Sequence, residues 1–115
     1  MSDRSMQEPT LLILTALADR PRHGYGLMQE IATISAGRYR MRTGTLYGAL
    51  DRLLGQNLIA VDREEIADGR ARRFYTLTGQ GRAALTAEAE RLRSVAAEAE
   101  RRLRAPRPRL QGGAA

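Results

Sequence analysis

The segment from Thr43 to Leu77 constrains the fold most strongly, because a helical pattern in it is followed directly by two strand patterns. Its first half spaces four leucines as one buried helical stripe, at positions Leu46, Leu50, Leu53 and Leu54. The other helical face is small or hydrogen-bonding, with Thr45, Tyr47, Gly48, Asp51 and Arg52. Two β-type runs follow, LIAVDRE and RRFYTLT, around a turn at residues 67–70. This order is typical of a winged helix-turn-helix and predicts DNA reading.

Two further helices are expected upstream. Pro9 suits the first turn of a helix over the apolar run LLILTALA, and Pro21 disfavours continuation of that helix. A second helix is predicted from about Tyr25 to Ser35, with a stop at Ala36 and Gly37. Thr43 is expected to be the N-cap of the third helix. The predicted fold class is therefore mainly α with a small β-hairpin (α+β).

A long fourth helix is predicted after the hairpin, capped by Thr78. Its apolar positions recur at intervals of 4, 3, 4, 3 and 4 residues: Leu85, Ala89, Leu92, Ala96, Ala99 and Leu103. One interpretation is a dimerisation seam; the other is packing against the chain's own first helix. We favour the seam, because it extends beyond what a small winged domain can cover.

Four segments follow from these patterns. They are a flexible arm (1–8), a winged helix-turn-helix DNA-binding domain (9–78), a C-terminal dimerisation helix (79–104) and a disordered tail (105–115). Within the long fourth helix, Glu98 to Arg102 and Glu100 to Arg104 are expected as ion pairs one helical turn apart.

The chain has a formal net charge of +6, and all 19 of its basic residues are arginine. No acid lies between Glu30 and Asp51 or between Asp68 and Glu88. Positive potential over these two windows would attract phosphate, although a solvated basic surface is the alternative interpretation. The candidate DNA-binding residues are Arg38, Arg40, Arg42, Thr43, Thr45, Tyr47, Arg70, Arg72 and Arg73.

Several classes of function find no support in the sequence. There is no cysteine, and His23 is the single histidine, so neither a metal site nor a cofactor is expected. Gly24 and Gly26 lack the spacing of a phosphate-binding loop. No nucleophile–base pair or carboxylate dyad indicates an enzyme. Without a signal-peptide pattern or an apolar run of about 20 residues, the chain is expected to be cytoplasmic.

Four motifs together resemble the PadR family of bacterial transcriptional regulators. They are the HGYG stretch at residues 23–26, the GTLY stretch at residues 44–47 with Leu50 and Leu53, the segment from Gly69-Arg70 to Tyr75, and Leu77-Thr78 with Gly81. The single C-terminal helix resembles the family's short subfamily. One departure is Gly48, where family members often have proline. Glycine at this position should loosen the helix by up to about 1 kcal/mol relative to alanine.

The resemblance implies a homodimeric winged-helix repressor that binds a palindromic operator and releases it on sensing a small-molecule effector or a stress. Some members of the short subfamily bind flat aromatic compounds between their C-terminal helices. This chain has no tryptophan and an alanine-rich seam, so such a stacking site is not indicated. The alternative function is a winged-helix module that binds protein without specific DNA binding.

Overall fold

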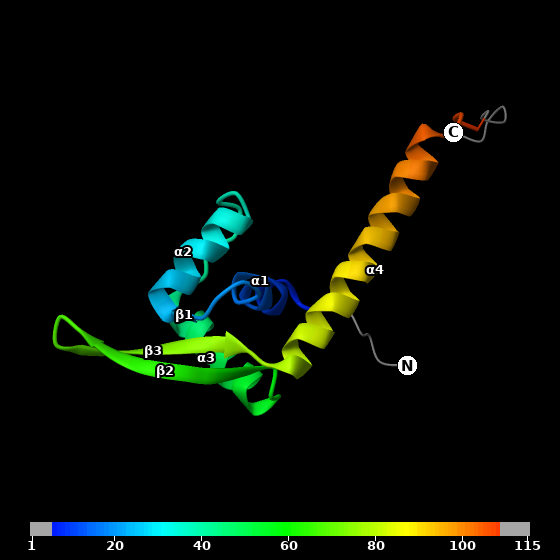
Figure 1. Cartoon of the computed structure of the whole chain (residues 1–115). Helices are drawn as coiled ribbons and strands as arrows, with labels where there is room; N and C mark the ends of the chain where they lie inside the picture. Colours follow the sequence, from blue (N-terminus) through cyan, green and yellow to red (C-terminus); the bar gives the residue numbers. More distant parts are fainter. Residues whose placement is uncertain (1–5, 109–115) are drawn as a thin grey trace.

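A computed structural model describes residues 6–108 as three short helices, a small sheet and one long helix (Figure 1). The elements are α1 (Glu8–Ala16), β1 (Arg22–His23), α2 (Gly24–Ile34), α3 (Thr43–Gly55), β2 (Ile59–Ala67), β3 (Arg70–Leu77) and α4 (Gly79–Arg104). The predicted α+β winged helix-turn-helix with a long C-terminal helix is confirmed. Most of the expected arm and tail, residues 1–5 and 109–115, lies outside the described residues.

The core lies where α1, α2 and α3 meet the sheet. α1 supplies the most completely buried part of the core: it contains four consecutive apolar residues, and two of them, Ile13 and Leu14, are fully buried. α2 adds Leu27 and Ile31, and the predicted stripe of α3 adds Leu46, Leu50 and Leu53. The stripe's fourth leucine, Leu54, is partly buried at the edge of this core. The helical spacing in the sequence therefore identified the inward faces correctly.

β1 is a strand that the sequence patterns did not indicate. It pairs antiparallel with β3 through Arg22 opposite Tyr75 and His23 opposite Phe74, giving the sheet order β1-β3-β2. Two residues are too few for an alternating pattern, so the strand exists only through its partner. Its consequence is that the start of α2 is fixed to β3.

The β2–β3 hairpin, here called the wing, turns through Asp68 and Gly69. Both have positive φ angles, 52° and 74°, as expected for the tight two-residue turn that matches strand twist. Ile59 and Val61 pair with Leu77 and Tyr75, but the register shifts between Val61 and Arg63. A bulge of this kind bends its strand, and the wing is a curved hairpin that projects beyond the helices (Figure 1).

Thr43 is not the N-cap of α3, contrary to expectation. Arg42 occupies that position with extended backbone, and no side chain caps the helix start. Thr43 is therefore the first helical residue, and its hydroxyl is exposed. The error arose because a threonine just before an apolar stripe is typical of an N-cap. Here the helix begins one residue earlier than that pattern predicts, so Thr43 lies inside it.

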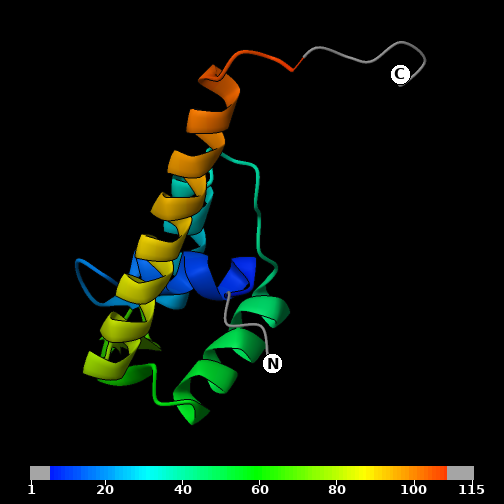
Figure 2. The ribbon, with the colours of Figure 1, turned by 90° about the vertical axis from the view of Figure 1, so that its right-hand side faces the viewer.

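Thr78 does cap α4, accepting a hydrogen bond from the Gly81 backbone N–H at 2.9 Å. The first turns of α4 pack on the body through Gly81 and Leu85, and the rest of the helix extends away from it (Figures 1 and 2). Glu98 pairs with Arg102 at 2.6 Å, as predicted, and also with Arg101. Among the described residues the expected Glu100–Arg104 pair does not form.

Candidate nucleic-acid interface

α3 presents its polar face to solvent because its apolar face is buried in the core. Leu46, Leu50 and Leu53 are fully buried, whereas Thr43, Thr45, Tyr47 and Gly48 are exposed. The exposed groups gather in the first two turns of the helix. This is the part of a helix-turn-helix that reaches base edges when the second helix lies in a major groove.

Three arginines precede α3 in an extended segment whose side chains alternate. Tyr39 and Met41 pack against the core, and Met41 is buried. Arg38, Arg40 and Arg42 consequently face solvent. Ser35 holds the start of the segment, since its hydroxyl oxygen accepts from the Tyr39 backbone N–H at 3.0 Å. The segment thus carries three exposed arginines: Arg42 directly precedes α3, whereas Arg38 lies beside Ile34 and Ser35 at the end of α2.

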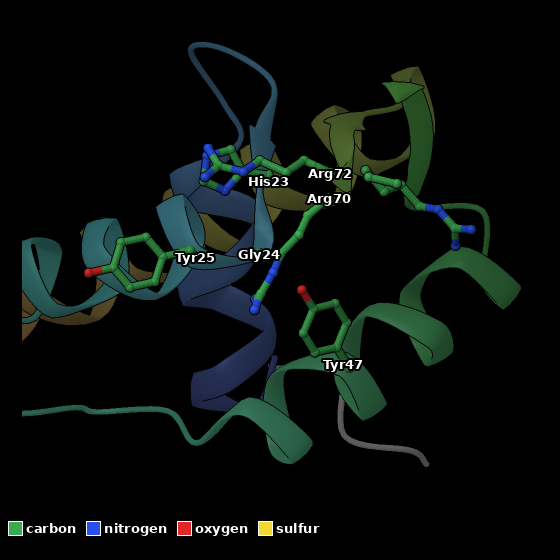
Figure 3. Close-up of a pocket in the computed structure, with 8 residues that line it drawn as sticks. His23, Gly24, Tyr25, Tyr47, Arg70 and Arg72 are labelled. Atoms are coloured by element: carbon green, nitrogen blue, oxygen red, sulfur yellow. The ribbon is translucent and has the colours of Figure 1, made fainter. Parts of the chain in front are cut away.

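A concave site of about 370 Å³ lies between the start of α2, the exposed face of α3 and the wing (Figure 3). It is lined by His23, Gly24, Tyr25, Tyr47, Arg70, Ala71, Arg72 and Arg73. Arg70 and Arg72 extend from β3 toward α2, and the Tyr47 hydroxyl points into the same space. Of the predicted residues, Tyr47 therefore meets the three wing arginines, whereas Thr43, Thr45 and the arginines of the extended segment do not line this site.

Tyr47 approaches α2 closely because residue 24 is glycine. A methyl group at Gly24 would overlap the Tyr47 hydroxyl and its ring carbon Cζ. The same site includes Tyr25, which is 65% exposed and was not among the predicted site residues. In the sequence, Tyr25 is distinguished only by following a glycine at the start of α2. That position indicates a turn and does not predict that the side chain lines a binding site.

His23 joins α2 to the sheet. Its Nδ1 accepts from the Gly26 backbone N–H at 3.2 Å, so the His23 side chain orders the start of α2. Its ring meets Phe74 of β3 edge to face, with centroids 5.1 Å apart. Burial, and then the positive charge of Arg72, hold the pKa of His23 below its ordinary value of 6.5. The neutral ring is the form that can accept at Nδ1.

The wing arginines divide into paired and unpaired groups. Arg63 pairs with Asp62 at 2.8 Å and Glu65 at 2.7 Å, and its guanidinium lies 4.0 Å from the Phe74 ring centroid. Arg73 pairs with Glu64 at 3.3 Å. Within residues 6–108, Arg70 and Arg72 form no ion pair. The sequence identified these arginines but could not show which were already neutralised.

The long helix carries an exposed apolar stripe beyond the body. Of the predicted seam residues, Leu85 packs against the core, while Leu92 and Leu103 are 40% and 83% exposed. Ala89, Ala96 and Ala99 are also exposed. Val95, which the prediction omitted, adds a side chain that is 57% exposed on the same side as Ala99. Packing against α1 therefore does not explain the upper half of the stripe.

Two further observations concern other kinds of site. Among residues 6–108, no group of three histidine, cysteine or acidic residues is arranged to hold a metal ion. None of the helices in that range is both long and apolar enough to cross a membrane.

A three-helix body, a wing and an exposed second helix of the helix-turn-helix define a winged helix-turn-helix protein. The sequence from residue 13 to residue 87 matches the transcriptional regulator PadR-like family, and the chain belongs to that family. It is 44% identical over 88 residues to Transcriptional regulator Rv3488 of Mycobacterium tuberculosis, covering 76% of this chain and 78% of the relative.

Solved structures show the same fold at lower identity. A PadR family transcription regulator from Clostridium difficile superposes with a TM-score of 0.71 at 23% identity, over 84% of this chain and 99% of that one. Bacillus subtilis PadR, solved in complex with operator DNA, superposes with a TM-score of 0.62 at 19% identity, over 92% of this chain and 51% of that one.

Proposed function

We propose that this PadR-family protein is a sequence-specific DNA-binding repressor that acts as a homodimer on a palindromic operator. One observation carries the proposal: five arginines, in the segment that leads into α3 and in the wing beside it, form no ion pair within residues 6–108. These are Arg38, Arg40, Arg42, Arg70 and Arg72. Unpaired guanidinium groups can bind phosphate without first losing a protein partner. The operator complex of Bacillus subtilis PadR supports the same use of this fold.

In this proposal α3 enters the major groove, and the arginines hold the phosphates on either side. Arg38 and Arg40 contact the backbone ahead of the helix, while Arg70 and Arg72 contact it from the wing. Tyr47 donates its hydroxyl to a phosphate in the concave site. Arg42, Thr43 and Thr45 are nearest to base edges, and arginine is the side chain that best matches the two acceptors of guanine.

The homodimer is proposed from the exposed upper part of α4. Leu92, Val95 and Leu103 form an apolar stripe on a helix that extends away from its own body. Pairing two such helices buries the stripe and relates the two α3 helices by a two-fold axis. Half-sites about 34 Å apart, one turn of DNA, would then match the two reading heads. A small-molecule effector of unidentified chemistry is part of this proposal.

The test is a DNA titration at several salt concentrations with four proteins. The wild type, Arg42→Ala, Arg72→Ala and the control Arg93→Ala are titrated against duplexes selected from a random library and against unselected DNA. Arg93 is an exposed arginine of α4, so the control removes the same charge from outside the site. Arg72→Ala should weaken binding and reduce the salt slope by about one, as should Arg42→Ala. Arg93→Ala should match the wild type.

The alternative function, a module that binds protein only, makes the opposite prediction. The wild type would then show no preference for any selected duplex over unselected DNA. Both site variants and the control would bind DNA with the same affinity as the wild type. Unchanged affinity and salt slope for Arg42→Ala and Arg72→Ala would remove the proposed phosphate contacts.

A further inference from the structure

The tip of the wing carries a large apolar side chain that the core does not use. Ile66 is 82% exposed, and its partner across the ladder is Ala71. Residues directly opposite one another in an antiparallel pair share a face. Ala71 lines the concave site together with Tyr47 of α3. Ile66 therefore lies on the wing face that is turned toward α3.

The position of Ile66 is well defined before any partner binds. The two-residue turn at Asp68 and Gly69 fixes the strand register, which keeps Ile66 opposite Ala71. An isoleucine side chain is also stiff at its first torsion, because it branches at Cβ. Burying this side chain against a partner would cost little conformational entropy.

Charge does not explain how the wing tip would hold DNA. From Asp62 to Arg73 the wing contains four arginines and four acids, so its formal charge is zero. Asp62, Glu64 and Glu65 are paired with Arg63 and Arg73. The unpaired Arg70 and Arg72 line the concave site. Arg70 and Arg72 can bind the DNA backbone, but a contact made by Ile66 itself depends on apolar burial.

We propose that Ile66 enters the minor groove beside the half-site and selects A·T over G·C base pairs there. This inference rests on the DNA-binding function proposed above. In the minor groove an A·T pair presents only acceptors, whereas a G·C pair adds the guanine N2 amine as a donor. Isoleucine cannot accept a hydrogen bond, so covering that amine would leave a buried donor unsatisfied. Apolar side chains, isoleucine included, are known to insert into minor grooves.

The test selects duplexes from a random-sequence library with the wild type, Ile66→Ser and the control Val61→Ser. Val61 is a half-exposed apolar residue of the same strand, near the packed end of the wing. All three proteins should select the same central sequence. The wild type and Val61→Ser should also enrich A·T pairs where the wing lies, and Ile66→Ser should not. Circular dichroism checks that each variant is folded.

A second measurement separates the minor-groove edge from the major-groove edge. Replacing the enriched A·T pairs by G·C should lower wild-type affinity about tenfold, the usual range for one unfavourable base pair. Replacing them by inosine·cytosine, which keeps the major-groove edge of G·C but lacks the N2 amine, should restore it. Ile66→Ser should bind all three duplexes with similar affinity.

The outcomes distinguish this inference from the proposed function. If the wild type enriches no sequence at all, DNA reading itself fails. If the wild type selects a central sequence but Ile66→Ser keeps the same flanking A·T enrichment, the role of Ile66 is overturned and DNA reading stands. Inosine·cytosine behaving like G·C would also overturn it, because the preference would then come from the major groove.

Discussion

Gly24 has no Cβ, and the Tyr47 hydroxyl lies in the space that a Cβ would fill. Gly24 is buried at the first position of α2, while Tyr47 is 44% exposed on α3. The pair therefore joins the two helices of the helix-turn-helix at the edge of the concave site. One missing methyl group orients a phenol hydroxyl that is proposed to bind phosphate.

Gly24→Ala should lower DNA affinity while changing stability little. The added methyl group pushes aside an exposed, movable side chain, so the free energy of unfolding should change by less than about 1 kcal/mol. The displaced hydroxyl no longer reaches its phosphate, and DNA titration should show weaker binding. Gly55→Ala is the control, since nothing lies within 4 Å of a methyl group there. Equal affinity for Gly24→Ala and wild type would show that the position of Tyr47 is unimportant.

His23 makes stability depend on pH near neutrality. Because its pKa is lowered in the folded protein, the unfolded chain binds more protons between the folded pKa and 6.5. The part of the folding stability that depends on neutral His23 should therefore be fully present above pH 6.5. It should decrease as the pH falls below that value. Protonation at Nδ1 also removes the acceptor for Gly26.

The measurement is denaturant unfolding at several pH values from about 5.5 to 7.5, which brackets the ordinary histidine pKa. His23→Asn is the matched variant, because asparagine can cap α2 but does not titrate. The wild type should lose stability relative to this variant as the pH falls. Parallel curves for the two proteins would contradict the assigned role.

Single residues also show where sequence reasoning succeeded and failed. The stripe Leu46, Leu50 and Leu53 was predictable because helical spacing is local. The pairing of Arg73 with Glu64 was not, because it depends on the register of two strands. Thr43 misled because capping depends on backbone angles that the residue type alone does not determine.

At the scale of elements, Thr78 connects the wing to α4. Its hydroxyl accepts from Gly81 and donates to the Asn57 carbonyl at 2.8 Å, so one side chain joins α4 to the segment after α3. Gly81 lies so close to the Leu58 carbonyl that a methyl group would overlap it. The start of α4 is thus held on two sides by the connection between α3 and β2.

Thr78→Ala should destabilise the protein by about 0.5–2 kcal/mol, the usual cost of a lost N-cap. Thr78→Ser keeps the hydroxyl and should remain close to the wild type. Urea unfolding of the three proteins measures the difference. Equal midpoints for Thr78→Ala and wild type would mean that the cap contributes nothing to stability.

Elements that depend on local patterns were predicted well, and those that depend on distant pairing were not. The helices and the wing turn were readable from spacing, glycine and proline. β1 was missed because Arg22 and His23 become a strand only by pairing with Tyr75 and Phe74, more than 50 residues later. The shift after Val61 was also unreadable, since one aspartate within a strand pattern does not specify a bulge.

At the scale of the whole molecule, the proposed dimer is the feature with the most direct test. Leu92→Glu combined with Val95→Glu places two charges in the exposed stripe of α4. Burying unpaired charges is costly, so this variant should have the mass of a monomer in light scattering at micromolar concentration. Ala97→Glu, on an exposed position off the stripe, is the control and should stay dimeric. A monomeric wild type would remove the dimer from the proposal.

Loss of the dimer should also weaken binding to a palindromic duplex far more than binding to a single half-site. Two linked reading heads gain affinity from their high effective concentration, and separated ones do not. This comparison distinguishes a dimer that reads DNA from one that forms for another reason.

Only Thr78 lies between the end of β3 and the start of α4. Because the joint is a single residue, a tilt of α4 in the proposed dimer should move the wing and the reading helix together. An effector bound between the two α4 helices of that dimer would change the spacing of the two α3 helices without touching DNA. The proposed effector would then act through that distance, which must match the helical repeat of the operator.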